Sequence, residues 1–263
     1  MQFKSSLLLI AALAASTFAR RHGHERRVHE GLTQPAEDLS KRDDVIPWTN
    51  FPNGQVSTAG FGGRTNLGGT GDEYGGNVGD PWGSNIILVP VTDAWQYNNV
   101  IQLQNVLTDP LTVVFWNKIG PDGGMNGWYQ GNSALTFQLA PGELQYVAVD
   151  DNSRGAFSAA VGSLPVDAQS GYDSTWGEFD FANAVNGNCN GYDVSMIQAQ
   201  AGGNQNIMGM SICQAPNLDC SSITNGATQI NQGYTQAQSY IGGIGGNLPP
   251  GPMRLVATLG FNG

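Results

Sequence analysis

Short apolar runs separated by turn-forming residues are the feature that most restricts what this sequence can fold into. Nine runs have the length and composition of strands: residues 85–91, 100–106, 111–116, 134–139, 144–149, 175–181, 194–200, 207–213 and 253–260. Turn sequences separate them, for example at 120–124 and 140–142, and 37 of the 263 residues are glycine. Short strands without helices between them predict a mainly β fold, an antiparallel β-sandwich.

One helix is predicted near the C-terminus. Between residues 223 and 241, apolar residues recur at alternating steps of four and three, which places them on one helical face. Ser221 or Ser222 can cap its start, and glycines can end it. The glycine-rich residues 242–246 precede prolines rather than a helix, so we interpret them as a flexible link and not as a phosphate loop.

The first 42 residues differ from the rest of the sequence. Residues 1–19 combine a basic start, an apolar stretch and small residues, the pattern of a secretory signal peptide rather than a membrane anchor. Residues 20–42 are polar and end in Lys41-Arg42, which predicts a propeptide with a dibasic processing site. A single domain is then expected over residues 43–263, and its first part, to about residue 77, is expected to form an irregular arm.

Removal of residues 1–42 changes the available chemistry. The three histidines, His22, His24 and His29, are all removed, which excludes histidine-dependent catalysis and histidine-ligated metals. The remainder holds four Lys and Arg against 17 Asp and Glu, a net charge of 4 − 17 = −13. Such a charge disfavours nucleic acid as a partner. No cofactor or metal is predicted, because the oxygen-rich residues 150–153 match a turn better than a calcium loop.

Three cysteines, Cys189, Cys213 and Cys220, leave one thiol unpaired after any intramolecular disulfide. Cys213 and Cys220 are the easiest pair because they close a short loop, although Cys189–Cys213 is also possible. We expect the remaining thiol to be buried and inert.

Two carboxylates form the first candidate site. Strand alternation places Glu178 and Asp180 on one face and Phe179 and Phe181 on the other, toward the core. Asp193 lies in the next predicted segment. Glu178 and Asp193 could therefore act as acid and nucleophile or base on a glycosidic bond, or they could be ordinary surface acids.

Aromatic residues form the second candidate site. Flat rings can stack on sugars, and the set includes Trp82, Trp116, Trp128, Tyr129 and Trp176. Trp128 and Tyr129 lie in a glycine-rich loop and are expected to be exposed, whereas Trp116 lies in an apolar strand and is expected in the core.

Long motifs identify a family resemblance. The sequence resembles the secreted fungal allergen family known as Asp f 4-like in Phe-Gly-Gly-Arg-Thr (61–65), Gly-Asn-Val-Gly-Asp-Pro-Trp-Gly-Ser-Asn-Ile (76–86), Thr-Val-Val-Phe-Trp-Asn-Lys-Ile-Gly-Pro-Asp-Gly-Gly (112–124) and Thr-Trp-Gly-Glu-Phe-Asp-Phe (175–181). The resemblance covers nearly all of residues 43–263. It implies a secreted protein that binds IgE, without an established biochemical activity.

A fainter resemblance, around Glu178-Phe179 and Tyr192-Asp193-Val194-Ser195, is to thaumatin-like proteins. It implies a β-sandwich with an acidic cleft for β-1,3-glucan, with Glu178 as the cleft glutamate and Asp193 as the first aspartate. The second aspartate of that family falls at Gln198, and its dense disulfide framework is missing here.

Three functions follow as expectations. The first is a secreted or wall-associated protein that binds a β-glucan-type polysaccharide of the fungal wall through Trp128, Tyr129, Asp180 and Gln198, beside Glu178 and Asp193. The second is a β-1,3-glucan hydrolase that uses Glu178 and Asp193. The third is a structural or host-interacting protein without a small ligand. No membrane association is expected after signal removal.

Overall fold

Two β-sheets packed face to face form the protein. The computed structural model describes residues 46–216 and 219–263, so the predicted signal peptide and propeptide lie outside the described residues. The seven-stranded sheet has the order β1 (Ile86–Val89), β5 (Leu144–Val149), β2 (Asn99–Asn105), β13 (Met253–Leu259), β9 (Met210–Gln214), β10 (Cys220–Ile223), β11 (Ile230–Asn231). The six-stranded sheet has the order β12 (Gly246–Leu248), β8 (Cys189–Ser195), β7 (Trp176–Asn183), β6 (Ser153–Val161), β3 (Leu111–Asn117), β4 (Leu135–Leu139).

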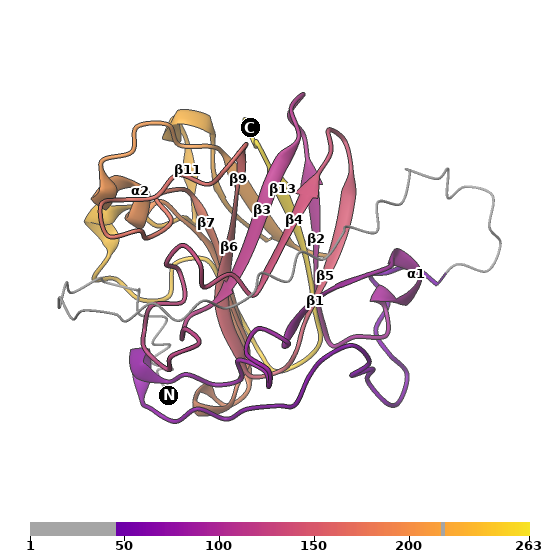
Figure 1. The fold of residues 1–263 in the computed structure, drawn as a ribbon. Coiled ribbons are helices and arrows are strands. Elements are labelled where there is room, and N and C mark those ends of the chain that lie inside the picture. Colours follow the sequence, from indigo (N-terminus) through magenta and orange to yellow (C-terminus); the bar gives the residue numbers. More distant parts are fainter. Residues whose placement is uncertain (1–45, 217–218) are drawn as a thin grey trace.

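Neighbouring strands in the described ranges pair antiparallel, except that β13 runs parallel to β2. Two short helices, α1 (Val91–Ala94) and α2 (Ile197–Gly202), lie on opposite sides in Figure 1. The mainly β prediction is therefore confirmed. No helix within the described ranges is long and apolar enough to cross a membrane.

Apolar side chains from both sheets meet in one core. The six-stranded sheet contributes stacked rings, with centroids 4.8 Å apart for Phe115 and Phe157 and 5.2 Å apart for Phe179 and Phe181. The facing sheet contributes aliphatic side chains such as Leu103. The alternation predicted for residues 176–181 is confirmed, because Phe179 and Phe181 point into this core.

The helix predicted over residues 223–241 is wrong. Ile223 ends β10, and the rest of the segment forms a strand and two 3₁₀ turns, η4 (Asn225–Ala227) and η5 (Gln236–Gln238). Gly226, Ala227 and Gln232 adopt positive φ angles, which interrupt a right-handed helix. The strand predicted at 194–200 is also wrong beyond Ser195, where α2 begins almost at once.

The N-terminal arm is irregular, as predicted. Arg254 on β13 binds the backbone of its first described residues. The Arg254 guanidinium is 1% exposed and donates hydrogen bonds to the backbone carbonyls of Trp48, Asn50, Trp95 and Tyr97. Burial lowers the pKa of Arg254 to about 10. Carbonyl dipoles around this cation thus replace its hydration shell.

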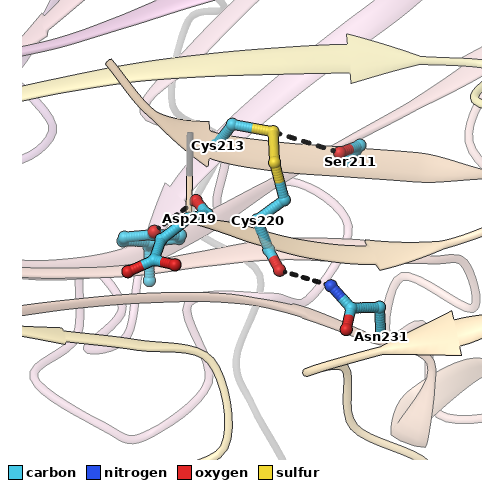
Figure 2. The surroundings of a disulfide bond; sticks show 6 residues. Ser211, Cys213, Asp219, Cys220 and Asn231 are labelled. Atoms are coloured by element: carbon cyan, nitrogen blue, oxygen red, sulfur yellow. Dashed lines mark hydrogen bonds between the residues drawn. A yellow bond between two sulfur atoms is a disulfide. The ribbon is translucent and has the colours of Figure 1, made fainter. Parts of the chain in front are cut away.

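A disulfide joins Cys213 and Cys220, the pair that closes the shortest loop. The two residues face each other on β9 and β10, and the Cys220 carbonyl accepts a hydrogen bond from Asn231 (Figure 2). Cys189 remains a free thiol at the start of β8. It is partly exposed rather than buried, contrary to our expectation.

Candidate functional site

The candidate site lies on the outer face of the six-stranded sheet, the face turned away from the seven-stranded sheet. Glu178 on β7 and Asp193 on β8 are direct cross-strand partners. Their neighbours Phe179 and Val194 point into the core, so alternation directs both carboxyl groups outward. The sequence separates them by a turn, and antiparallel pairing brings them together.

Strand pairing and burial bring the two carboxyl groups together. Asp193 is 0% exposed, and neither of its carboxylate oxygens has a conventional donor among the described residues. Its polar partner is the Glu178 carboxyl, and a hydrogen bond between two carboxyl groups requires a proton on one of them. Burial, and then the charge of Glu178, hold the pKa of Asp193 well above its ordinary value.

Glu178 is less enclosed than Asp193, with a partly exposed side chain. Burial raises the pKa of Glu178, while the hydrogen bond from Asp193 and the charges of Lys118 and Arg154 oppose that rise. The pair therefore behaves as one unit that retains a proton at pH values where an isolated carboxyl is ionised.

Two buried cations and a third acid adjoin the pair. Arg154 on β6 lies 3.5 Å from Asp180, measured from Nε to Oδ2, and donates hydrogen bonds to the carbonyls of Gly71 and Tyr74. Asn183 donates a 2.7 Å hydrogen bond to the same Oδ2 of Asp180. Burial raises the pKa of Asp180 despite the nearby Arg154 charge. The outer face thus buries several ionisable groups within a small region.

Aromatic rings cover the same face beside these charges. Trp116 packs against Tyr172 and Trp176 with centroids 5.0 and 5.2 Å apart, and Trp128 joins the cluster at 6.2 Å from Trp176. Trp128 is only 4% exposed, so the expectation of an exposed ring is wrong; Tyr129 beside it is partly exposed. Trp116 is fully buried, as expected, but in this outer cluster rather than in the core between the sheets.

The structure brings some predicted residues together and places others elsewhere. Glu178, Asp180 and Asp193 share one region, whereas Gln198 on α2 donates a 2.7 Å hydrogen bond to Asp167. The indole N–H groups of Trp116 and Trp128 have no hydrogen-bond partner among the described residues. No group of three or more His, Cys, Asp or Glu side chains suited to a metal occurs in residues 46–216 and 219–263.

Sequence reasoning missed three members of the site: Lys118, Arg154 and Tyr234. Lys118 and Arg154 are two of the four basic residues that follow the predicted leader, and both are at least nine-tenths buried. Because basic residues are so rare after residue 42, each of them could have been considered a candidate site residue. Their position beside Glu178 could not be predicted, because it depends on which strands pair. The segment that contains Tyr234 pairs with Ser195 at the end of β8, and the wrongly predicted helix concealed that contact.

Comparison with known proteins supplies the family. Residues 84–259 match the Allergen Asp f 4-like domain. The chain is also 42% identical to Allergen Asp f 4 of Aspergillus fumigatus, and the alignment covers 99% of both chains. The protein belongs to the Allergen Asp f 4-like family. The matched residues span the strands from β1 to β13, so the candidate site lies within the Asp f 4-like domain.

One solved structure offers a weaker comparison. The protein elicitor MoHrip2 from Magnaporthe oryzae is 12% identical to this Asp f 4-like chain, with a TM-score of 0.37. The match covers 62% of this chain and 98% of MoHrip2. At this TM-score the similarity supports no functional inference. The thaumatin-like resemblance remains an expectation from sequence.

Proposed function

We propose that this allergen-family protein binds an extracellular carbohydrate of the β-glucan type through the outer face of the six-stranded sheet. One observation carries the proposal: polar groups without partners are buried there beside aromatic rings. The indole N–H groups of Trp116 and Trp128 are unused donors, and Oδ1 of Asp180 is an unused acceptor. Because these atoms are buried, ordered water beneath the surface, rather than the sugar itself, would pair with them, and such water can bridge to sugar hydroxyls at the surface.

Two partly exposed side chains give a ligand access to this face. Tyr129 offers a ring at the edge of the aromatic cluster, with its centroid 5.5 Å from that of Trp128. Glu178 offers a carboxyl group at the edge of the buried charges. A sugar ring stacked on Tyr129 would place its hydroxyls toward the polar groups of the sheet. Gln198 and Asp167 extend this polar surface toward α2.

The predicted signal peptide supports an extracellular location, either free or associated with the fungal wall. Recognition by IgE is part of the same proposal, because the chain belongs to a family described as allergens. Such recognition requires only a stable folded surface and is independent of the carbohydrate site.

Burial of Asp193 favours binding over hydrolysis by this pair. Asp193 is 0% exposed, so its carboxyl group has no access to the glycosidic bond of an external ligand. Glycosidases keep their two carboxyl groups about 5 Å or more apart, because the scissile bond and often a water molecule must fit between them. A fully buried Asp193 leaves no such space open to a sugar. The hydrolase alternative predicts sugar release from laminarin that is lost in Glu178→Gln.

A binding assay tests the proposal. We expect the secreted protein to bind insoluble β-1,3-glucan and soluble laminarin, and Tyr129→Ala to weaken binding about 3- to 10-fold through loss of ring stacking. Glu178→Gln tests the carboxyl group. Tyr240→Ala, at a 78% exposed ring, and Glu143→Gln, in the turn between β4 and β5, are matched controls. Absence of binding to β-glucan and chitin would leave the structural or host-interacting function as the better explanation.

A further inference from the structure

We propose that the Glu178–Asp193 pair is a proton-dependent latch that holds residues 242–246 and the Tyr234 segment against the edge of the six-stranded sheet. One shared proton keeps the latch closed, and its loss opens that edge. The proposal concerns the conformation of the free protein and does not depend on a carbohydrate ligand.

The closed state requires a proton on the Glu178–Asp193 pair. Asp193 is fully buried, and neither of its carboxyl oxygens has a donor among the described residues, so the pair is accommodated when Asp193 itself carries the proton and donates it toward Glu178. If both groups were ionised, two negative charges would lie in contact at low dielectric, which proteins avoid by protonation or by letting water in. The arrangement is therefore stable only while the proton is present.

The glycine segment, residues 242–246, lies beside Asp193 at the edge of the sheet. A Cβ at Gly245 would come within 2.6 Å of Cβ of Asp193, because the pairing of β12 with β8 continues to this position. Gly246 begins β12, which pairs with β8 only over three residues at the edge of the sheet. Gly243 and Gly245 adopt positive φ angles of 83° and 98°. A short edge strand preceded by such glycines is easily displaced.

Tyr234 connects the glycine segment to the pair. Its hydroxyl accepts a 3.0 Å hydrogen bond from the backbone N–H of Ile244, and its ring packs with Ile197 and Ile244. Its own backbone bonds to Val194 and Met196, which flank the end of β8. Burial raises the pKa of Tyr234 to about 12, and the charges of Asp193 and Glu178 add to this rise. Tyr234 therefore stays neutral while the pair titrates.

The other charged groups that face the pair determine the pH at which it loses its proton and the latch opens. Lys118, beyond the end of β3, and Arg154 on β6 favour ionisation of Glu178. Asp180 on β7 neutralises part of that effect through its contact with Arg154. For Asp193 the near charge is Glu178 itself. Because burial is the largest influence on both carboxyl groups, the proton is retained above the ordinary carboxyl range, and opening is expected as the pH rises.

Amide hydrogen exchange across pH 4 to 9 tests the latch in the protein without ligand. After correction for intrinsic exchange, we expect protection of the Tyr234 and Ile244 amides to fall at least about tenfold between pH 4 and pH 8. The Leu255 amide on β13, in the middle of the other sheet, reports global unfolding. Its protection should change much less than that of the two latch amides.

Two substitutions replace the proton by a permanent donor. Asp193→Asn and Glu178→Gln each let an amide N–H group donate to the remaining carboxylate, so the latch should stay closed up to pH 9. Asp173→Asn is the matched control, because burial also raises the pKa of Asp173 outside the pair. The proposal is overturned if wild-type protection is independent of pH, if Leu255 loses protection equally, or if both variants retain the wild-type decrease.

Discussion

The inner face of the six-stranded sheet meets the other sheet through phenylalanine rings, whereas its outer face buries acids, cations and indoles under loops. β7 contributes to both, because Phe179 and Phe181 point inward while Glu178 and Asp180 point outward. The stability contributed by the inner face depends on the apolar area buried and on how well the side chains fit together. The stability contributed by the outer face depends in addition on the protonation of its acids and on the charges that pair with them.

The two faces of β7 should therefore contribute to stability in different ways, one independent of pH and one dependent on it. The inner face should contribute equally between pH 4 and pH 8, because phenylalanine rings do not titrate and burial raises the pKa of the one tyrosine named in this core, Tyr192, to about 12. The outer face should contribute most in acid, where the Glu178–Asp193 pair holds its proton. Substitutions on either side of β7 can therefore test whether the two faces act independently.

The largest effect is expected from the inner face. Phe181→Ala removes a fully buried ring and should lower the free energy of unfolding by about 3–5 kcal/mol, at pH 4 and pH 8 alike. Denaturant unfolding measures this change. Val185→Ala, at a 55% exposed side chain just after β7, is the control and should change stability by less than about 0.5 kcal/mol. A loss that differed between the two pH values would show that the faces are coupled.

The disulfide should have the next largest effect. Cys213 and Cys220 are seven residues apart, and removal of both as Cys213→Ala/Cys220→Ala should cost about 2–3 kcal/mol through the gain in unfolded-chain entropy. Thermal unfolding of the oxidised protein measures the loss. Cys189→Ala removes a thiol outside the disulfide and should leave the midpoint nearly unchanged. Equal destabilisation by both variants would contradict a specific role for the disulfide.

The sequence predicts much of the inner face and little of the loops that cover the outer one. Short apolar runs between turn residues identify the strands around residues 111–117 and 144–149, whose residues are mostly buried on both faces. β6 is missed because its alanines and serines give a weak apolar signal. Residues 223–241 imitate a helix since Ile223 and Tyr234 are buried at helical spacing by two separate contacts, one in β10 and one beside β8.

The outer face can be tested through the pH dependence of stability. Protonation of a carboxyl group whose pKa is raised by folding stabilises the folded state. This contribution is complete below about pH 4 and is lost as the pH rises through the raised pKa. Wild-type stability should therefore fall from pH 4 toward pH 8. Asp193→Asn should stabilise the protein at pH 8 by on the order of 1–3 kcal/mol and flatten the profile.

Urea unfolding at a series of pH values measures that profile, and Asp173→Asn should keep most of the wild-type slope. An Asp193→Asn profile as steep as the wild-type profile would show that other acids, such as Asp180, dominate the dependence.

The candidate site is predictable only in part, for a related reason. Glu178 is recognisable because it interrupts an aromatic strand, and Asp193 because it lies in the next segment. Their contact depends on the register between β7 and β8, which local patterns do not determine. The buried position of Trp128 follows from packing against Trp176, a contact between residues far apart in the chain.

The smallest predicted effect concerns the edge of the outer face. Tyr234→Phe keeps the ring packed with Ile197 and Ile244 but removes the hydroxyl that accepts the Ile244 N–H. We expect a loss of about 1 kcal/mol in unfolding free energy and faster exchange of the Ile244 amide already at pH 4. Because both carboxyl groups remain, the stability profile against pH should keep its wild-type slope. A flattened slope in Tyr234→Phe would mean that the tyrosine hydroxyl, rather than the shared proton, links residues 242–246 to the sheet.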